Sequence, residues 1–258
     1  MENYKLLVDT AALAGEIMLS SGAETYRVED TMYHILKTSE NKSIEALALL
    51  TGIVVTVNDE SMEQPLTVMK TVNDRTTNMS TIIKVNDISR KYCGGQITLE
   101  EAYEKLKTVR GKQYNRFLYN LGTVGIAIGF SMMLGARLQE LVVTAIVGSL
   151  LATVITLGKI AKWSGIFVNA LGGFGIGLIA LLFKAIIFPE MNSDIVIIGA
   201  VMPIVPGVAI TNAIRDTLQG DYLSGCGRTM EAFLTAASVA VGIGLGMLAA
   251  NGIIGGVL

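Results

Sequence analysis

The chain has 258 residues, of which 51% are hydrophobic and 28 are glycine, and its formal net charge is −2. This composition favours a membrane protein, because a soluble domain of this size needs a larger share of polar residues. The near-zero charge gives no indication of nucleic-acid binding. His34 is the only histidine, which excludes metal sites built from several histidines.

Residues 1–112 hold most of the charged side chains and are predicted to form a cytoplasmic α+β domain. Apolar residues at helical spacing predict a first helix that ends near Leu19. Ser21 and Glu24 have the spacing of a capping box, which predicts the start of a second helix.

The rest of this domain is predicted to combine a pair of strands with two more helices. Residues 46–57 are rich in β-branched side chains and predict one strand, with residues 66–72 as its partner. A helix is expected over residues 78–92. Thr98 and Glu101 form a second capping box, which opens the last helix of the domain.

Residues 113–258 are predicted to form a transmembrane domain, since long apolar runs follow one another there. Each run is close to the twenty residues that a helix needs to cross a bilayer. The expected spans cover residues 117–134, 140–157, 164–188, 194–218 and 230–250. The predicted fold is therefore a mainly α membrane protein, with a five-helix bundle after the α+β domain.

The distribution of basic residues predicts the orientation. Three groups of Lys and Arg lie on one side of the predicted membrane, whereas the opposite loops offer only Arg137, with Lys184 near an end. The three groups are Lys105, Lys107, Arg110, Lys112 and Arg116; Lys159 and Lys162; and Arg215 and Arg228. We therefore expect a multi-pass protein of the cell membrane with its N-terminus in the cytoplasm and its C-terminus outside. Cys93 and Cys226 then lie in the cytoplasm as reduced thiols.

The fourth predicted span is interrupted near its middle by Pro203, Pro206 and Gly207. A proline removes a backbone donor and breaks the helix, and the half-helix over residues 208–218 then begins with unsatisfied N–H groups. Transporters use such broken helices to hold anionic groups of their substrates. A proline kink that serves only packing is the alternative.

Polar side chains on this half-helix are the next candidates for substrate binding. Asn212, Arg215 and Asp216 are spaced to share one face, and Thr211 precedes them. Ionisable residues inside a span are candidates for function. Alternatively, Arg215 and Asp216 anchor the helix at the membrane boundary, and Thr211 bonds to its own helix. The candidate set is Pro203, Pro206, Gly207, Thr211, Asn212, Arg215 and Asp216.

A second charged cluster lies near the N-terminus, where Glu24, Arg27 and Glu29 are candidates for a gate. A solvated start of a helix is the alternative. Glycines repeat in the first, third and fifth predicted spans and indicate close helix packing. A Cys93–His34 nucleophile pair is the remaining enzymatic possibility, and no local pattern supports it.

Two stretches, SGAETYRVEDTM from Ser21 and MPIVPGVAITNAIRDTLQGDYLSGCGR from Met202, resemble the threonine/serine exporter family. The resemblance covers the whole chain and implies export of a small carboxylate, driven by the proton gradient, without a cofactor or metal. Longer family members carry a second membrane unit, so this chain resembles the larger subunit of the split form, such as the two-component succinate exporter. It implies a small polytopic membrane protein as partner, in a hetero-oligomer with several copies.

We therefore predict a non-enzymatic subunit of a secondary transporter that exports threonine/serine-like amino acids or dicarboxylates such as succinate. The alternatives are a regulatory or scaffolding subunit whose partner holds the pathway, and a membrane hydrolase.

Overall fold

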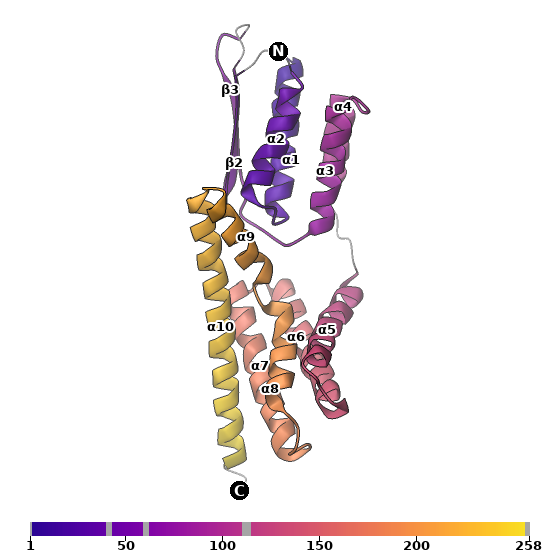
Figure 1. The fold of residues 1–258 in the computed structure, drawn as a ribbon, viewed down its shortest axis with the longest axis vertical. Coiled ribbons are helices and arrows are strands. Elements are labelled where there is room, and N and C mark those ends of the chain that lie inside the picture. Colours follow the sequence, from indigo (N-terminus) through magenta and orange to yellow (C-terminus); the bar gives the residue numbers. More distant parts are fainter. Residues whose placement is uncertain (1, 40–42, 59–61, 110–114, 256–258) are drawn as a thin grey trace. The chain divides into compact units, whose positions relative to one another are not determined.

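The computed structural model describes residues 2–39, 43–58, 62–109 and 115–255 (Figure 1). Contacts divide the chain into two compact units. The first unit comprises Met1–Lys112 and Val208–Met230, and the second comprises Gln113–Gly207 and Glu231–Leu258. Residues 208–230 thus contact the N-terminal region, although the sequence groups them with the spans. The predicted domain boundary at residue 112 lies outside the described residues, as do Arg110 and Lys112 of the basic group.

Four helices build most of the first unit: α1 (Glu2–Ser20), α2 (Thr25–Lys37), α3 (Met79–Cys93) and α4 (Leu99–Val109). The helical spacing in the sequence buries one continuous face, with Val8, Ile17 and Met32 fully inaccessible in the core. The second predicted capping box is confirmed, since Thr98 N–H donates to the Glu101 carboxylate at 3.2 Å and Glu101 N–H donates to Thr98 Oγ1 at 3.2 Å.

A three-stranded antiparallel sheet packs against α1 and α2, in the order β1 (Ser43–Leu49), β2 (Gly52–Asn58), β3 (Leu66–Thr71). The pairing of β2 with β3 confirms the predicted partner strand. The single strand predicted over residues 46–57 is wrong, because Leu49 pairs with Gly52 and the chain reverses at Leu50 and Thr51. Neither central turn residue is a usual turn former, and the signal in the sequence is Gly52, at the last position of the turn, where glycine is favoured.

The capping box predicted from Ser21 and Glu24 is also wrong. Helix α2 begins at Thr25, and its N-cap residue Glu24 makes no side-chain bond to the helix start. The spacing of Ser21 and Glu24 predicted the wrong cap, because the side chain that accepts a hydrogen bond from the first N–H of α2 comes from a distant part of the chain.

The second unit consists of α5 (Arg116–Met133), α6 (Leu138–Ala161), α7 (Gly165–Ile186), α8 (Ser193–Val201), a 3₁₀ turn η1 (Met202–Ile204) and most of α10 (Tyr222–Gly255). Among the described residues, α6, α7 and α10 are each long and apolar enough to cross a membrane. The segment Ser193–Ile204 and helix α9 (Gly207–Leu218) meet this requirement only together, as a bent pair. The five-span count therefore stays a prediction, since α5 is not among these candidates.

Between α8 and α9 the backbone leaves the helical path at Val205, which is extended with φ −65° and ψ 131°. Val205 N–H donates to Met202 O at 3.3 Å, and Gly207 N–H donates to Val205 O at 2.8 Å. Helix α10 begins at Tyr222, eight residues before the predicted span, so the stretch between α9 and α10 is only Gln219–Asp221.

Glycines let α7 and α10 approach to backbone contact within the second unit. A methyl group added at Gly173 would lie 2.6 Å from Val239 O, and one at Gly177 would lie 2.5 Å from Ile243 O. Gly242 and Gly246 are equally close to the backbone of α7. Close packing is thereby confirmed for these four glycines of the third and fifth predicted spans. In α5, by contrast, added methyl groups at Gly122, Gly125 and Gly129 meet nothing within 4 Å.

Candidate functional site

The polar face of α9 lies against the turn between α1 and α2, within the first unit. Asn212 and Asp216, one helical turn apart, are both buried, with 5% and 0% of their surface exposed. Asn212 Nδ2 donates to Gly22 O at 2.9 Å. Two candidate residues that the sequence placed on one face therefore share one environment, built by a loop about 190 residues earlier in the chain.

Asp216 supplies the cap that α2 lacks. Its Oδ1 accepts a hydrogen bond from Thr25 N–H at 3.2 Å and another from Thr25 Oγ1 at 2.9 Å. Thr25 is the first residue of α2, so the carboxylate sits at the positive end of that helix. A buried carboxylate is stabilised there by both the helix dipole and the bonds it accepts.

Arg228, in the first part of α10, completes the charge balance around Asp216. Its Nε lies 2.8 Å from Asp216 Oδ2, and its Nη2 donates to Ala23 O at 2.7 Å. The two side chains are 6% and 0% exposed, so this is a buried ion pair. A buried pair is costly to desolvate, and removing one partner leaves the other charge without compensation.

The edge of the same contact is more accessible. Arg215 Nη1 donates to Glu24 Oε1, and Arg27 Nη1 lies 3.6 Å from Glu24 Oε2. Glu24 is nearly buried, with 8% of its side chain exposed, whereas Arg215 and Arg27 are 55% and 42% exposed. We define the latch as the Gly22–Ala23–Glu24–Thr25 turn together with Asn212, Arg215, Asp216 and Arg228.

Comparison with known proteins decides what kind of protein carries this latch. Residues 9–249 match the family model described as "Putative threonine/serine exporter". The chain belongs to the threonine/serine exporter family. This is a transporter family and not an enzyme family, and the apolar helices agree with a membrane protein.

A family relative is the "Probable threonine/serine exporter" of Mycobacterium tuberculosis, which is 25% identical over 247 residues. The match covers 94% of this chain and 46% of the relative, so the chain spans about half the length of that protein. No solved structure matches the chain.

In this member of the exporter family, the predicted gate residues separate into two environments. Glu24 and Arg27 belong to the edge of the latch, but Glu29 turns to the sheet, where its Oε1 accepts a hydrogen bond from Ala48 N–H at 2.9 Å. Burial raises the pKa of the Glu29 carboxyl, and the nearby carboxylates of Asp221 and Asp216 raise it further, against the lowering effect of the Ala48 bond.

The remaining candidates lie outside the latch. Pro203 lies within η1, Pro206 precedes α9 and Gly207 is the first residue of α9. Thr211 is on the exposed side of α9. Thr25 and Arg228 are the residues that sequence reasoning missed as partners. Each lies inside one of the two stretches that resemble the exporter family, and this was the signal in the sequence that could have marked them. Their contacts depend on tertiary structure.

The structure does not support the Cys93–His34 nucleophile pair. Cys93 Sγ donates to the backbone carbonyl of His34 at 3.5 Å, while the His34 ring pairs with Asp30 at 3.2 Å. Partial burial raises the pKa of the Cys93 thiol, which disfavours the reactive thiolate. Cys93 and Cys226 are both free and exposed. Within the described ranges, no group of three or more His, Cys, Asp or Glu side chains could hold a metal.

Proposed function

We propose that this chain is a transporter subunit that exports threonine/serine-like amino acids, with the latch acting as a gate on α9. Family membership supports the transport class, and the latch is the single observation that carries the gating role. In this structure, Asn212, Arg215 and Asp216 contact the α1–α2 turn, so they are occupied by the protein itself. A substrate could reach the buried Asn212 and Asp216 side chains only after the turn has moved away.

The latch has the contacts that a gate requires. It is closed by an ion pair and by bonds to three backbone groups of one turn, the carbonyls of Gly22 and Ala23 and the N–H of Thr25. These contacts join segments about 190 to 205 residues apart and can break together without unfolding either helix. A two-state element of this kind is what an alternating-access mechanism needs.

We place substrate binding at the break, where Pro203 and Pro206 interrupt the helix and Gly207 starts α9. A methyl group added at Gly207 meets nothing within 4 Å, so the fold leaves space for a side chain to begin there. Gly207→Leu should abolish efflux with normal expression, because the side chain blocks approach to the helix start. Gly244→Leu is the matched control, since Gly244 is equally open. Unchanged efflux in the Gly207 variant would contradict this assignment.

The substrate test uses intact cells that are loaded with serine, threonine or succinate, with and without expression of the chain. We expect efflux of the two hydroxy amino acids that depends on the proton gradient. Efflux of succinate alone would favour the dicarboxylate alternative. If Gly207→Leu leaves all fluxes unchanged while loss of the partner stops them, the chain is a scaffolding subunit.

We further propose that the N-terminus is cytoplasmic and the C-terminus outside, because of the basic groups before α5 and between α6 and α7. Reporters fused at Met1 and after Leu258 should then report opposite sides of the membrane. Reporters on the same side would contradict a five-span arrangement.

A small polytopic membrane protein is proposed as the partner, in a hetero-oligomer with several copies. The support is the open glycine face of α5 and the presence of one bent helix pair among the described residues, where transporters of this kind use two related repeats. Liposomes with the chain alone should show little flux, and addition of the partner should restore it. Full flux from the chain alone would exclude an obligatory partner.

A further inference from the structure

A polar pocket of about 380 Å³ lies between α2 and α3, within the first unit. Each helix lines the pocket with side chains at helical spacing, so one face of α2 is opposite one face of α3. The lining residues that carry its chemistry are Arg27, Asp30 and His34 on α2 and Ser89, Arg90 and Cys93 on α3. The volume is in the range of pockets that bind small molecules.

Two arginines line this α2–α3 pocket without a close acidic partner. Arg90 makes no ion pair with the described residues. Arg27 is 3.6 Å from Glu24 Oε2, which is longer than a hydrogen bond. The one lining acid, Asp30, is 3.2 Å from the His34 ring and pairs with neither arginine in the described part of the chain. The pocket therefore holds two guanidinium charges that its own side chains do not neutralise.

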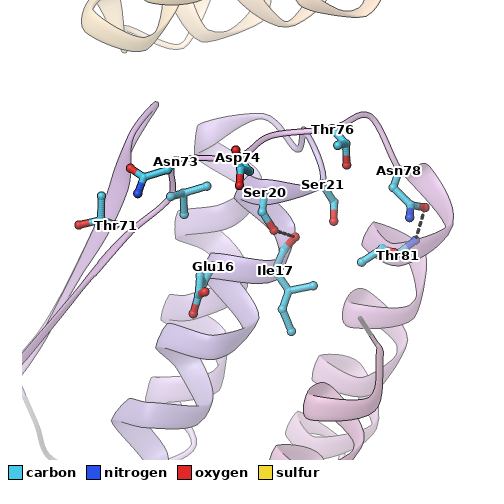
Figure 2. A pocket seen from close by; sticks show the side chains of 11 residues that line it. Glu16, Ile17, Ser20, Ser21, Thr71, Asn73, Asp74, Thr76, Asn78 and Thr81 are labelled. Atoms are coloured by element: carbon cyan, nitrogen blue, oxygen red, sulfur yellow. Dashed lines mark hydrogen bonds between the residues drawn. The ribbon is translucent and has the colours of Figure 1, made fainter. Parts of the chain in front are cut away.

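A second cavity of the first unit has the opposite character. It has a volume of about 470 Å³ and lies between the end of α1, the end of β3 and the start of α3 (Figure 2). No Lys or Arg lines it, and two of its polar side chains bond within the protein, since Ser20 Oγ donates to Ile17 O and Asn78 Oδ1 accepts from Thr81 N–H. Of the two cavities, the α2–α3 pocket is therefore the one that suits an anion.

We propose that the α2–α3 pocket binds a small dianionic oxyanion between Arg27 and Arg90. Guanidinium groups form strong charge-assisted hydrogen bonds with phosphate and carboxylate oxygens. Because the two arginines come from different helices, a ligand with two negative charges compensates both, whereas a monocarboxylate leaves one without a partner. Inorganic phosphate carries its two charges on one centre, and a short dicarboxylate carries them on two.

This ligand and the latch share Arg27. Glu24 Oε2 is buried and accepts no hydrogen bond from the described residues, although Arg27 is the nearer of two arginines to that oxygen in its ion pair. A dianion that draws Arg27 into the pocket competes with Glu24 for one guanidinium and leaves Glu24 paired with Arg215. An effect of this competition on the opening of the latch rests on the proposed function, whereas binding in the pocket does not.

The test uses the two natural cysteines of the full chain in lipid nanodiscs. Cys93 lines the pocket, whereas Cys226 is on α10 and outside it, and both thiols are exposed. Above neutral pH, where phosphate is mainly dianionic, phosphate or malonate should slow the reaction of uncharged N-ethylmaleimide with Cys93. The rate at Cys226 should not change, as measured by mass spectrometry of the two peptides. Acetate at the same ionic strength should protect Cys93 far less.

Variants of the two arginines show whether the protection comes from the pocket. Arg90→Gln should raise the concentration that half-protects Cys93 about tenfold or more, because a charge-assisted contact is lost. Arg27→Gln should have the same effect, and its melting temperature shows whether loss of the Glu24 pair disturbs the fold. Lys84→Gln is the matched control, since Lys84 is an exposed residue of α3 outside the pocket.

Gly207→Leu separates this inference from the transport proposal. Protection of Cys93 that persists in Gly207→Leu and is weakened in Arg90→Gln supports the pocket, even if no efflux is measured in any variant. Protection by phosphate alone identifies a ligand with a single charged centre, and protection by malonate alone identifies a dicarboxylate. Failure of both anions to protect the unmodified chain, equal protection by acetate, or equal protection in Arg90→Gln and Lys84→Gln overturns the proposal.

Discussion

The latch in the first unit and the glycine contact between α7 and α10 in the second unit differ in the interactions that hold their helices together. Both hold together helices that are distant in sequence. The latch uses charge, with Asp216 and Arg228 buried as a pair, whereas the glycine contact uses shape, with Gly177 and Gly242 removing side chains so that backbones meet.

This difference separates what can switch from what cannot. An ion pair can exchange its partners for water or for a charged ligand, so it is open to competition. Backbone packing of glycine helices contains no group that titrates or that a solute can replace. On the proposed function, the latch is therefore the part that moves, and α7 and α10 form the fixed scaffold.

The largest expected effect is the loss of one buried charge. Asp216→Ala leaves Arg228 buried without its partner and uncaps α2, which should destabilise the first unit by about 3–5 kcal/mol. Thermal unfolding of the purified chain measures this. The double variant Asp216→Leu, Arg228→Met should recover most of the loss, because it removes both charges. A double variant as unstable as the single one would show that the pair itself is not the cause.

A smaller loss is expected from filling the glycine contact. Gly242→Val forces a side chain against the backbone of α7 at Ala170 and should cost about 1–3 kcal/mol. Gly244→Val is the control, because an added methyl group there meets nothing within 4 Å. Equal melting temperatures for the two variants would contradict the packing of α7 against α10.

Among the charged contacts of the latch, the Arg215–Glu24 pair at its edge should contribute least to the stability of the first unit. Arg215 is 55% exposed, so solvent screens its pair with Glu24. Arg215→Ala should change the free energy of unfolding by less than about 1 kcal/mol. A loss as large as that of Asp216→Ala would mean that the edge and the centre of the latch act as one network.

The smallest effect is a dependence on pH at Glu29. Burial raises the pKa of Glu29 in the folded state, so folding favours the protonated carboxyl. That stability is lost as the pH rises from the ordinary value of 4.5 through the folded pKa. Glu29→Gln keeps an acceptor for Ala48 N–H and removes the charge. Its melting temperature should exceed that of the unmodified chain near pH 7 but not near pH 4. A difference that is equal at both pH values would exclude titration of Glu29.

Much of the fold follows from local sequence, and the site does not. The helical spacing in residues 1–19 and the Thr98–Glu101 capping box act over a few residues, so they are readable from the chain. The reversal at Leu50 and Thr51 was missed because its two central residues are not turn formers and a single glycine, Gly52, marks it within an apolar run. The candidate residues on α9 followed from their spacing, but their partners did not. Thr25 and Asp216 are 191 residues apart, and only tertiary structure shows that one helix caps another.

The two exposed thiols offer natural labelling sites for measuring a distance across the latch. Cys93, at the end of α3, and Cys226, two residues before Arg228, both belong to the first unit and are the only cysteines of the chain. Spin labels attached to the unmodified sequence would therefore form a single pair within each chain, one label on the N-terminal helices and the other beside the buried arginine. One narrow distance distribution describes the closed latch, and a second population that grows with added substrate would count the open molecules directly, without any engineered residue.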